Sequence, residues 1–404
     1  MPRVTPTFNH NALMRIAIIM AFIQFTNALE YMMFNPIFAF MAADFTVPVS
    51  YSGYVSGMYS SGAVISGIIA FYWIGRFNQK RFLITNMALL GLLTLLTTFT
   101  SSFSLLLTLR FCAGLVGGTT MGVGMSILIN HAPADLRGKM LATVIASFSM
   151  VSIVGMPTIL FLSTHYGWHV ALWLISTLCL LALPLIISVI PPDTAPSDTS
   201  YTLPLDSDTL LFASSNALVQ FSPMLIIPVL VPLMTLQLGA DRDMLPWLFF
   251  GGGVAGFLAT KITGIFTTHF SALALAIGST LVFILSLLIP LFGYPHAAIF
   301  MTLFLAASYS RLVSSSAVSI QFPDNSQRAG FSSLQTSIMY LITTVAFFLS
   351  ALLLPAHDMA PQNMTLLLVV CAISASGFPI IVVMMQKKLA KRTVQHVKQN
   401  TFTP

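Results

Sequence analysis

The sequence predicts an all-α integral membrane protein, with twelve transmembrane helices arranged as two pseudo-symmetric six-helix bundles. Charged residues make up only 7% of the chain and hydrophobic residues 56%, whereas an ordinary soluble domain is about 25% charged. Apolar segments of about 20 residues, the length that a helix needs to cross a bilayer, recur along the whole chain. Because so few charges cannot cover a water-exposed surface, we expect the lipid bilayer to surround this protein.

Short polar breaks separate the apolar segments, and the first segment is too long for the apolar region of a secretory signal peptide. One longer polar stretch, rich in Pro, Ser, Thr and Asp, has the composition of a linker. We therefore expect an N-terminal bundle over residues 1–191, a cytoplasmic linker over 192–208, and a C-terminal bundle over 209–404 with a basic cytoplasmic tail. The predicted helices cover residues 14–40, 51–73, 81–101, 103–129, 140–164, 168–190, 209–236, 245–268, 271–293, 297–320, 330–354 and 363–386.

The distribution of basic residues predicts the orientation. With both termini in the cytoplasm, thirteen of the 17 Lys and Arg residues lie on the cytoplasmic side and only Arg242 lies on the other side. Cytoplasmic loops carry such an excess of positive charge in membrane proteins. We expect a multi-pass protein of a bacterial inner (plasma) membrane, and a monomer.

The two halves of the sequence resemble each other. The tripeptide Asn-Ala-Leu occurs at 27–29 in the first predicted helix and again at 216–218 in the seventh, and matching Arg137 to Arg328 aligns the fifth helix with the eleventh without a gap. Secondary transporters use duplicated bundles that rock around a central binding site. The duplication therefore predicts a transporter that works by alternating access.

The fourth predicted helix and the loop after it resemble the major facilitator superfamily. The stretch "LRFCAGLVGGTTMGVGMSILINHAPADLRGKM" has Arg110 in the place of the family's helix-four arginine, then a glycine-rich face, then a loop that contains Arg137. Gly114, Gly118 and Gly122 have the spacing of small residues that allows close helix packing. The resemblance extends over essentially the whole chain and implies the family's twelve-helix fold.

The fifth predicted helix is similar to the antiporter motif of drug/proton antiporters. Its Gly155-Met156-Pro157 resembles the sugar-efflux branch of the family, as does Gly167-Trp168 at the start of the next helix. The motif's trailing glycine pair is absent here. The resemblance implies that Gly155 and Pro157 serve the conformational change of an exporter.

The loop between the second and third predicted helices keeps part of another family motif. It has Gly67, Arg76, Lys80 and Arg81, but Phe71 stands where the family usually has an acidic residue. The resemblance assigns Gly67, Arg76 and Arg81 to the conformational motifs, together with Arg137, Gly114 and Gly118. The missing acid leaves the transport mode open.

Glu30 is the only glutamate in the chain and lies in the middle of the first apolar segment. Gln24, Asn27, Tyr31 and Asn35 share its helical face by their three- and four-residue spacing. Ionisable residues inside membrane helices are costly and usually face a bundle interior or a water-filled cavity. Since burial and a neighbouring cation act on a carboxyl in opposite directions, we expect Glu30 to exchange protons during transport.

Arg110 is the expected partner of Glu30. The first helix runs outward and the fourth runs inward, and at 1.5 Å per residue the two side chains differ in depth by only a few ångströms. A buried ion pair adds little net stability. We therefore expect a pair that forms and breaks during the transport cycle, and we assign proton coupling to Glu30 and Arg110.

Two further cations, Lys261 and Arg311, lie within predicted helices of the second half. Together with Arg110 and ionised Glu30 they give a net charge of +2, which favours an anionic, zwitterionic or acceptor-rich substrate. Gln335 and Tyr340 lie on the eleventh helix, which in the resembled family faces the cavity. The expected substrate-binding residues are Asn27, Tyr31, Asn35, Arg110, Lys261, Arg311, Gln335 and Tyr340.

Other functional classes have little support in the sequence. Cys112, Cys179 and Cys371 lie in apolar segments without metal-ligand spacing, and no converging nucleophile or carboxylate pair predicts an enzyme. The basic residues sit at helix ends, which does not favour nucleic-acid binding. We expect a proton-coupled exporter of a small organic molecule, without a cofactor and driven by the proton gradient. The alternative is a proton symporter or facilitator that takes up an organic anion.

Overall fold

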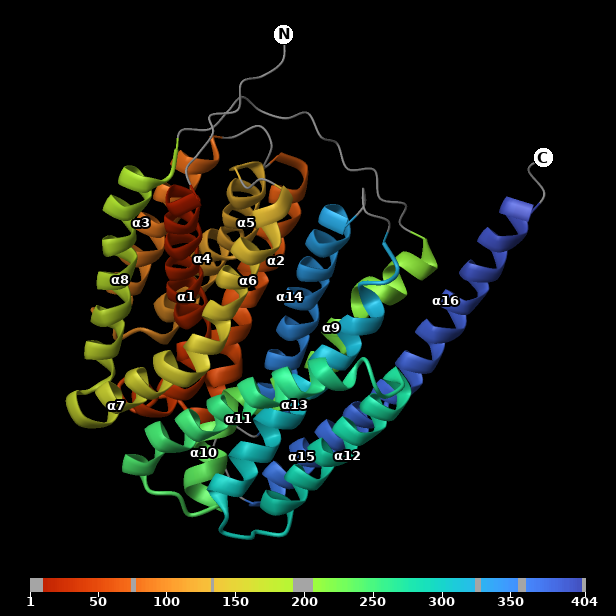
Figure 1. The fold of residues 1–404 in the computed structure, drawn as a ribbon. Coiled ribbons are helices and arrows are strands. Elements are labelled where there is room, and N and C mark those ends of the chain that lie inside the picture. The colour runs from red at the N-terminus through yellow and green to blue at the C-terminus, as the bar shows by residue number, and fades with distance from the viewer. Residues whose placement is uncertain are drawn as a thin grey trace.

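A computed structural model describes residues 10–73, 78–131, 134–191, 206–323, 328–354 and 361–401, in which every regular element is a helix (Figure 1). The all-α fold is thereby confirmed. The elements of the first half are α1 (His10–Met41), η1 (Val49–Tyr51), α2 (Ser52–Trp73), α3 (Gln79–Thr97), α4 (Phe103–Gly117), α5 (Thr120–His131), α6 (Ala134–Met150), η3 (Val151–Gly155), α7 (Met156–Tyr166) and α8 (Trp168–Val189). Those of the second half are α9 (Ser207–Ile226), η4 (Ile227–Val229), α10 (Leu230–Pro232), η5 (Leu233–Gln237), η6 (Arg242–Met244), α11 (Leu245–Phe266), α12 (Ala272–Leu291), α13 (Ala297–Ser319), α14 (Arg328–Leu353), α15 (Pro361–Ser376) and α16 (Phe378–Thr401).

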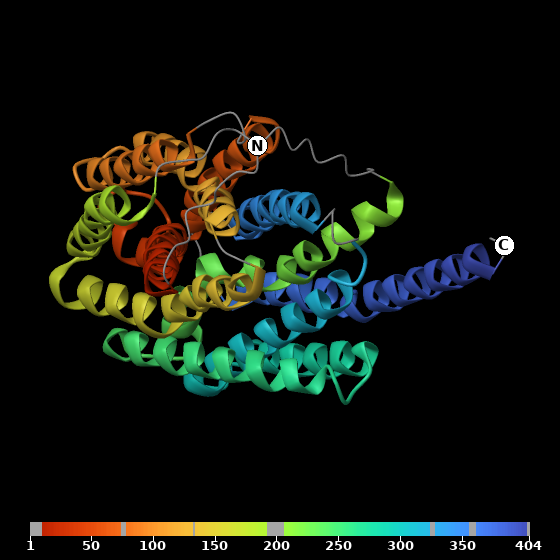
Figure 2. The ribbon, with the colours of Figure 1, turned by 45° about the horizontal axis from the view of Figure 1, so that its top comes forward.

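The helices of the first half group on one side of the molecule and those of the second half on the other (Figures 1 and 2). α1 begins and α16 ends at the same end of the molecule, which we call the terminal end. The opposite end is called the far end below. The side of the membrane on which each end lies remains a prediction from the charge distribution.

Eleven segments in the described part of the chain are long and apolar enough to cross a membrane. They coincide with eleven of the twelve predicted helices. The twelfth prediction, over 51–73, is the 22-residue helix α2, which contains several serines, glycines and tyrosines. α2 packs on α4 in its own half and on α14 in the other half.

Prolines and glycines interrupt four of the predicted helices, the twelfth at Gly377 between α15 and α16. The fifth contains the π-helical turn η3 just before Pro157, and the seventh passes from α9 into the short elements η4, α10 and η5 around Pro228 and Pro232. Proline has no N–H to give to the preceding turn, and such local rearrangements are the usual result. The fourth breaks between α4 and α5 at Gly118.

The two halves meet at the far end. A Cβ on Gly53, at the start of α2, would collide with the backbone carbonyl of Phe347 on α14, and a Cβ on Gly57 would lie 2.9 Å from the Phe348 ring. Only glycine permits so close an approach of two helices. Arg242, whose guanidinium carbon lies 5.7 Å from the centre of the Phe40 ring, adds a further contact between the halves.

The basic C-terminal tail is helical rather than irregular. α16 continues past the predicted end of the last helix and projects beyond the other helices (Figure 1). Lys388 forms an ion pair of 2.6 Å with Asp208, and Arg392 donates to the carbonyl of Phe322 at 2.6 Å. These contacts tie the tail to the start of α9 and to the end of α13.

Candidate functional site

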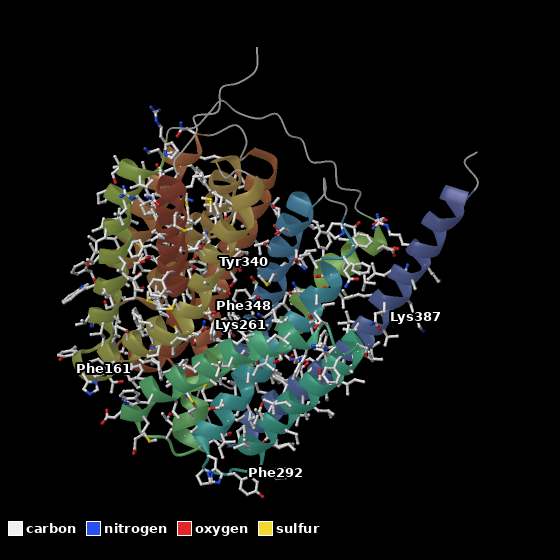
Figure 3. All side chains as sticks on the ribbon, in the orientation of Figure 1. Phe161, Lys261, Phe292, Tyr340, Phe348 and Lys387 are labelled. Carbon is white, nitrogen blue, oxygen red and sulfur yellow. The ribbon has the colours of Figure 1, made fainter. Side chains whose placement is uncertain are left out.

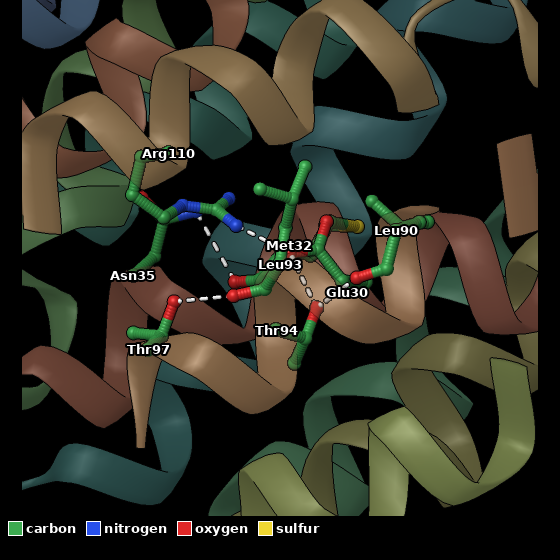
Figure 4. Close-up of polar contacts among 8 residues, drawn as sticks. All are labelled: Glu30, Met32, Asn35, Leu90, Leu93, Thr94, Thr97 and Arg110. Atoms are coloured by element: carbon green, nitrogen blue, oxygen red, sulfur yellow. Dashed lines mark hydrogen bonds and ion pairs between the residues drawn. The ribbon is translucent and has the colours of Figure 1, made fainter. Parts of the chain in front are cut away.

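A buried ion pair joins α1 to α4. Arg110 Nη1 donates to Glu30 Oε1, and both side chains are fully buried (Figure 4). Thr94 on α3 places its hydroxyl 3.4 Å from the same carboxylate oxygen and 2.8 Å from the carbonyl of Leu90. Because a hydroxyl carries one proton, Thr94 can donate to only one of these two acceptors at a time. The structure thus brings together the two residues that the sequence assigned to proton coupling.

Aromatic rings enclose the guanidinium group of Arg110. The guanidinium carbon lies 3.8 Å from the centre of the Phe34 ring and 4.6 Å from that of Tyr59. A cation close to an aromatic face is stabilised by the ring's quadrupole, and more strongly when water is excluded. Arg110 is therefore held by one carboxylate and two rings, which together offset the cost of burying its charge.

Several polar atoms around the pair make no hydrogen bond to any residue that the structure describes. They include Glu30 Oε2, the Nε and Nη2 of Arg110, Asn27 Oδ1 and the Tyr59 hydroxyl. Buried polar groups normally have a partner, and leaving them without one costs free energy. The site therefore offers both donors and an acceptor to a small polar molecule.

Three tyrosines lie next to the ion pair and come from both halves. The ring of Tyr31 on α1 stacks on that of Tyr59 on α2 at 4.9 Å between centroids, and meets the ring of Tyr340 on α14 edge-on at 6.0 Å. The Tyr31 hydroxyl lies 3.4 Å from Ser60 Oγ. We call Tyr31, Tyr59 and Tyr340 the tyrosine cluster, in which one pair of rings is stacked and the other pair meets edge-on.

Two of the predicted polar residues of α1 are buried in this region. Asn35 donates to the carbonyl of Met32 at 3.2 Å and is shown with the ion pair in Figure 4. The Oδ1 of Asn27 faces α4, where a Cβ added to Gly117 would lie 3.0 Å from it. The polar face predicted for the first helix thus points into the N-terminal bundle.

The structure does not bring the other predicted substrate-binding residues to this site. Arg311 is buried within the C-terminal half, where it donates to Ser222 and Ala375. Lys261 on α11 is exposed, with Nζ 5.7 Å from the centre of the Phe257 ring (Figure 3). Gln335 bonds Ser319 at 3.5 Å, inside its own half. Of the three cations expected around Glu30, Arg110 alone contacts it among the described residues.

The glycine spacing of the fourth helix predicts close helix packing at three positions, and two of them show it. A Cβ on Gly114 would collide with the carbonyl of Tyr59, and one on Gly118 would lie 2.6 Å from Ala63 on α2. Nothing lies within 4 Å of a Cβ on Gly122, which differs from the expectation. Gly122 therefore has no close packing contact with the residues that this structure describes.

The remaining motif residues have varied surroundings. Gly155, the last residue of η3, packs on Leu29, and Gly67 lies opposite Ser337 of the other half. The backbone N–H of Arg81 donates to Asn78, which caps α3. Arg76 and the side chain of Arg137 lie outside the described residues.

Sequence reasoning missed Tyr59 and Phe34, which hold Arg110, and Thr94, which lies beside Glu30. The signal for Tyr59 was the series of serines, glycines and tyrosines in α2. No comparable signal marks Phe34 or Thr94, because phenylalanines and threonines occur throughout the apolar segments.

The described residues thus form an all-helical architecture with an ion pair buried inside one bundle. The sequence model of the Major Facilitator Superfamily matches residues 20–208, which is most of the first half of the chain. Known structures of the same fold cover the rest. A bacterial homologue of the human lysosomal transporter Spinster superposes with a TM-score of 0.71 at 15% identity, covering 94% of this chain and 99% of that one. The nucleoside transporter NupG superposes with a TM-score of 0.72 at 11% sequence identity, and the match covers 92% of this chain and 99% of NupG. Residues 20–208 thus match the Major Facilitator Superfamily, and the solved structures show the same fold for the chain as a whole.

Characterised relatives are similar over shorter regions. A niacin transporter of Acinetobacter baylyi is 29% identical over 110 residues, which is 27% of this chain and 24% of the relative. A chloramphenicol resistance protein of Streptomyces lividans is 24% identical over 155 residues, 37% of this chain and 38% of the relative. A 4-hydroxybenzoate transporter of Acinetobacter baylyi is 24% identical over 154 residues, which is 38% of this chain and 34% of the relative. In each case the similarity spans well under two thirds of the relative's length.

Proposed function

We propose that this chain is a proton-coupled secondary transporter that exports a small aromatic organic molecule, with Glu30 as the protonation site and Arg110 as its alternating partner. The observation that carries the proposal is the fully buried Glu30–Arg110 pair, whose free polar atoms lie beside the tyrosine cluster. An ionisable group inside a membrane protein is retained for function more often than for stability.

The tyrosine cluster supports an aromatic substrate. The relatives named above are associated with niacin, 4-hydroxybenzoate and chloramphenicol, all of which contain one aromatic ring and several hydrogen-bond acceptors. A planar ring can stack on Tyr31 or Tyr340, while its acceptors take the unpartnered donors of Arg110.

The charge of the substrate decides the direction of proton coupling. A neutral substrate whose hydroxyl donates to Glu30 Oε2 stabilises the ionised carboxylate, so its binding expels a proton. That competition produces antiport and hence export. One unit of difference in the pKa of a group corresponds to about 1.4 kcal/mol, which is enough to bias a two-state transporter.

An aromatic anion has the opposite consequence and gives the second candidate function. It competes with the Glu30 carboxylate for Arg110, so it binds when Glu30 is protonated and travels together with the proton. The excess of cationic residues over acidic residues within the predicted helices and the two transporters of aromatic acids among the relatives favour this symport of an organic anion.

Proton flux into liposomes tests the proposal. Purified protein is reconstituted with an internal pH dye, and chloramphenicol, niacin and 4-hydroxybenzoate are added under an imposed proton gradient. We expect at least one compound to drive proton movement that Glu30→Gln abolishes. Asp208→Asn, which removes the exposed ion pair with Lys388, is the matched control and should behave as wild type.

The sign of the flux separates the two functions. Proton movement opposite to the compound indicates antiport, and movement with the compound indicates symport. If Glu30→Gln transports a compound with unchanged proton coupling, Glu30 has a structural role and the proposal is wrong.

A further inference from the structure

Arg311 is a second buried arginine, in the interior of the C-terminal half. It lies on α13 with no exposed surface, and its guanidinium donates to Ser222 Oγ on α9 at 2.8 Å and to the carbonyl of Ala375 on α15 at 3.2 Å. The rings of Phe283 and Phe378 lie 4.6 and 5.6 Å from its guanidinium carbon. These neighbours all belong to the C-terminal half, so the location is distinct from the Glu30–Arg110 site.

No acidic residue balances the charge of Arg311. The six predicted membrane helices of the C-terminal half contain neither Asp nor Glu, and Arg311 forms no ion pair with any described residue. The described contacts of Arg311 are two neutral hydrogen-bond acceptors and two aromatic rings, and none of them carries a negative charge. The positive charge of Arg311 inside the bundle is therefore not neutralised by these groups. Removing such a charge from water costs several kcal/mol unless an opposite charge compensates for it.

Three buried donor atoms on α12 and α13 have no acceptor in the described part of the chain. Among the described residues, Arg311 Nε, Ser315 Oγ and Thr280 Oγ1 have no hydrogen-bond partner, and all three side chains are buried. Ser315 follows Arg311 by one turn of α13, and Thr280 precedes Phe283 by one turn of α12. Residues three or four apart share one face of a helix. Both hydroxyls therefore lie on helix faces that meet at Arg311.

The two halves supply these groups from corresponding helices. In the first half, α4 provides Arg110, α3 provides Thr94 and α1 provides the carboxylate of Glu30. In the second half, α13 provides Arg311, α12 provides Thr280, and α9 provides only the hydroxyl of Ser222. The carboxylate of Glu30 is therefore the one of these three groups that has no equivalent in the described helices of the second half.

We propose that Arg311, with Ser222, Ser315 and Thr280, binds a small monovalent inorganic anion of the size of chloride, which neutralises the buried guanidinium. The anion accepts hydrogen bonds from the Arg311 Nε–H and from the hydroxyls, and such charge-assisted bonds are about twice as strong as neutral ones. This inference is independent of the transport proposal, since no group of the Glu30 site takes part.

Thermal unfolding of the purified protein tests the site, because an anion that binds only the folded state raises Tm. Chloride replaces gluconate at constant ionic strength, and we expect Tm to rise with chloride and then saturate. Arg311→Gln should remove the chloride response. Ser315→Ala and Thr280→Val, which keep the charge of Arg311, should weaken chloride binding about tenfold for each lost charge-assisted bond.

Ser163→Ala, at a buried serine of the first half, is the control and should keep the full response. Crystals grown with bromide should show an anomalous peak beside Arg311 Nε. A wild-type Tm that does not depend on chloride overturns the proposal, and so does an unchanged response in Arg311→Gln. Bromide found only on the surface would mean an adventitious ion only, which also overturns it.

Discussion

Tyr340 of α14 meets Tyr31 of α1 edge-on, with 6.0 Å between the ring centroids. The contact crosses between the two halves of the transporter, and Tyr31 directly follows Glu30 in the chain. A change at the Glu30–Arg110 pair therefore has a short path to the other half through one pair of rings. Edge-to-face aromatic pairs contribute about 0.5–1.5 kcal/mol beyond the area that they bury, a size that can shift an equilibrium between two transporter states.

Replacing Tyr340 tests this connection. We expect Tyr340→Ala to lower transport of aromatic compounds about tenfold, because it removes a stacking surface and the contact between the halves. Tyr340→Phe keeps the ring and should retain most of the activity. Initial rates in liposomes measure both. Equal rates for Tyr340→Ala and wild type would show that the cluster has no part in transport.

A double substitution separates the charge of the pair from its contacts. Arg110→Gln leaves Glu30 without its cation and should destabilise the protein by about 3–5 kcal/mol. The double variant Glu30→Gln/Arg110→Gln removes both charges and should recover much of that loss, although it should not couple transport to protons. Unfolding in detergent measures the free energies. A double variant no more stable than Arg110→Gln would contradict the picture of mutually compensating charges.

Close packing of α4 on α2 leads to a third prediction. Gly114→Ala should destabilise the protein by about 1–3 kcal/mol, because the added methyl group would overlap the carbonyl of Tyr59 and the backbone would have to move. Gly122→Ala is the matched control, since nothing lies within 4 Å of its Cβ. Thermal unfolding in detergent compares them. Similar Tm values for both variants would show that α4 and α2 adapt without cost.

How far the sequence could predict the site depended on the kind of information that each residue required. The depth of Glu30 and of Arg110 follows from counting residues along two helices, and the two side chains do meet. To place Arg311, it was necessary to know which way its side chain points as well as its depth along the helix. A helix in the interior of a bundle has one face toward the other half and another toward its own half, and a single sequence does not distinguish them. For that reason Arg311 was placed at the substrate site, whereas it lies inside the C-terminal half.

The fold was more predictable than the breaks within it. Spanning helices follow from length and apolar composition, and most predicted segments match the observed helices to within a few residues. The exceptions are the fifth helix, which starts at Ala134, and the last, which continues to Thr401. Pro157, Pro228 and Pro232 were visible, yet whether a proline kinks a helix or produces a π or 3₁₀ turn depends on which neighbours accept the freed carbonyl groups. Tyr59 was missed because its role, to hold Arg110, depends on contacts with residues of α1 and α4 that the sequence of α2 does not reveal.

The N-terminal cap of α9 gives a prediction about pH. Asp206 precedes the helix, and its carboxylate accepts hydrogen bonds from the side chain and from the N–H of Thr209, the latter at 2.8 Å. These bonds hold the pKa of Asp206 below its usual value. A lowered pKa in the folded state means that the stabilisation is present above the pKa of the unfolded chain and is lost as the pH falls through the lowered value.

Hydrogen exchange at the first turn of α9 measures this effect. Protection should fall when the pH drops below the ordinary range for aspartate, and Asp206→Asn, which caps without a charge, should make protection independent of pH in that range. Asp206→Ala should lower protection at every pH. An acid-induced loss in Asp206→Asn equal to that of wild type would assign the effect to another group.

Ser152 and Tyr309 form a direct polar bond between the two halves, with 2.8 Å between their hydroxyl oxygens. Ser152 lies in the π-helical turn η3. The backbone of this turn lies close to α11, since a Cβ added to Gly253 of α11 would be 2.6 Å from the carbonyl oxygen of Ser152. The bond forms where the chain of the fifth helix is distorted. It stabilises the present arrangement of the halves, in which the far end is closed.

Tyr309→Phe removes this bond and keeps the ring, so it should shift the balance between transporter states without unfolding the protein. A hydrogen bond contributes about 0.5–1.5 kcal/mol, which predicts a change of about two- to tenfold in the ratio of the two states. Spin labels placed on α2 and α14 at the far end measure the separation of the halves. We expect a larger fraction of molecules with the far end open in Tyr309→Phe and in Ser152→Ala alike. No change in either variant would show that the helix contacts alone set the balance.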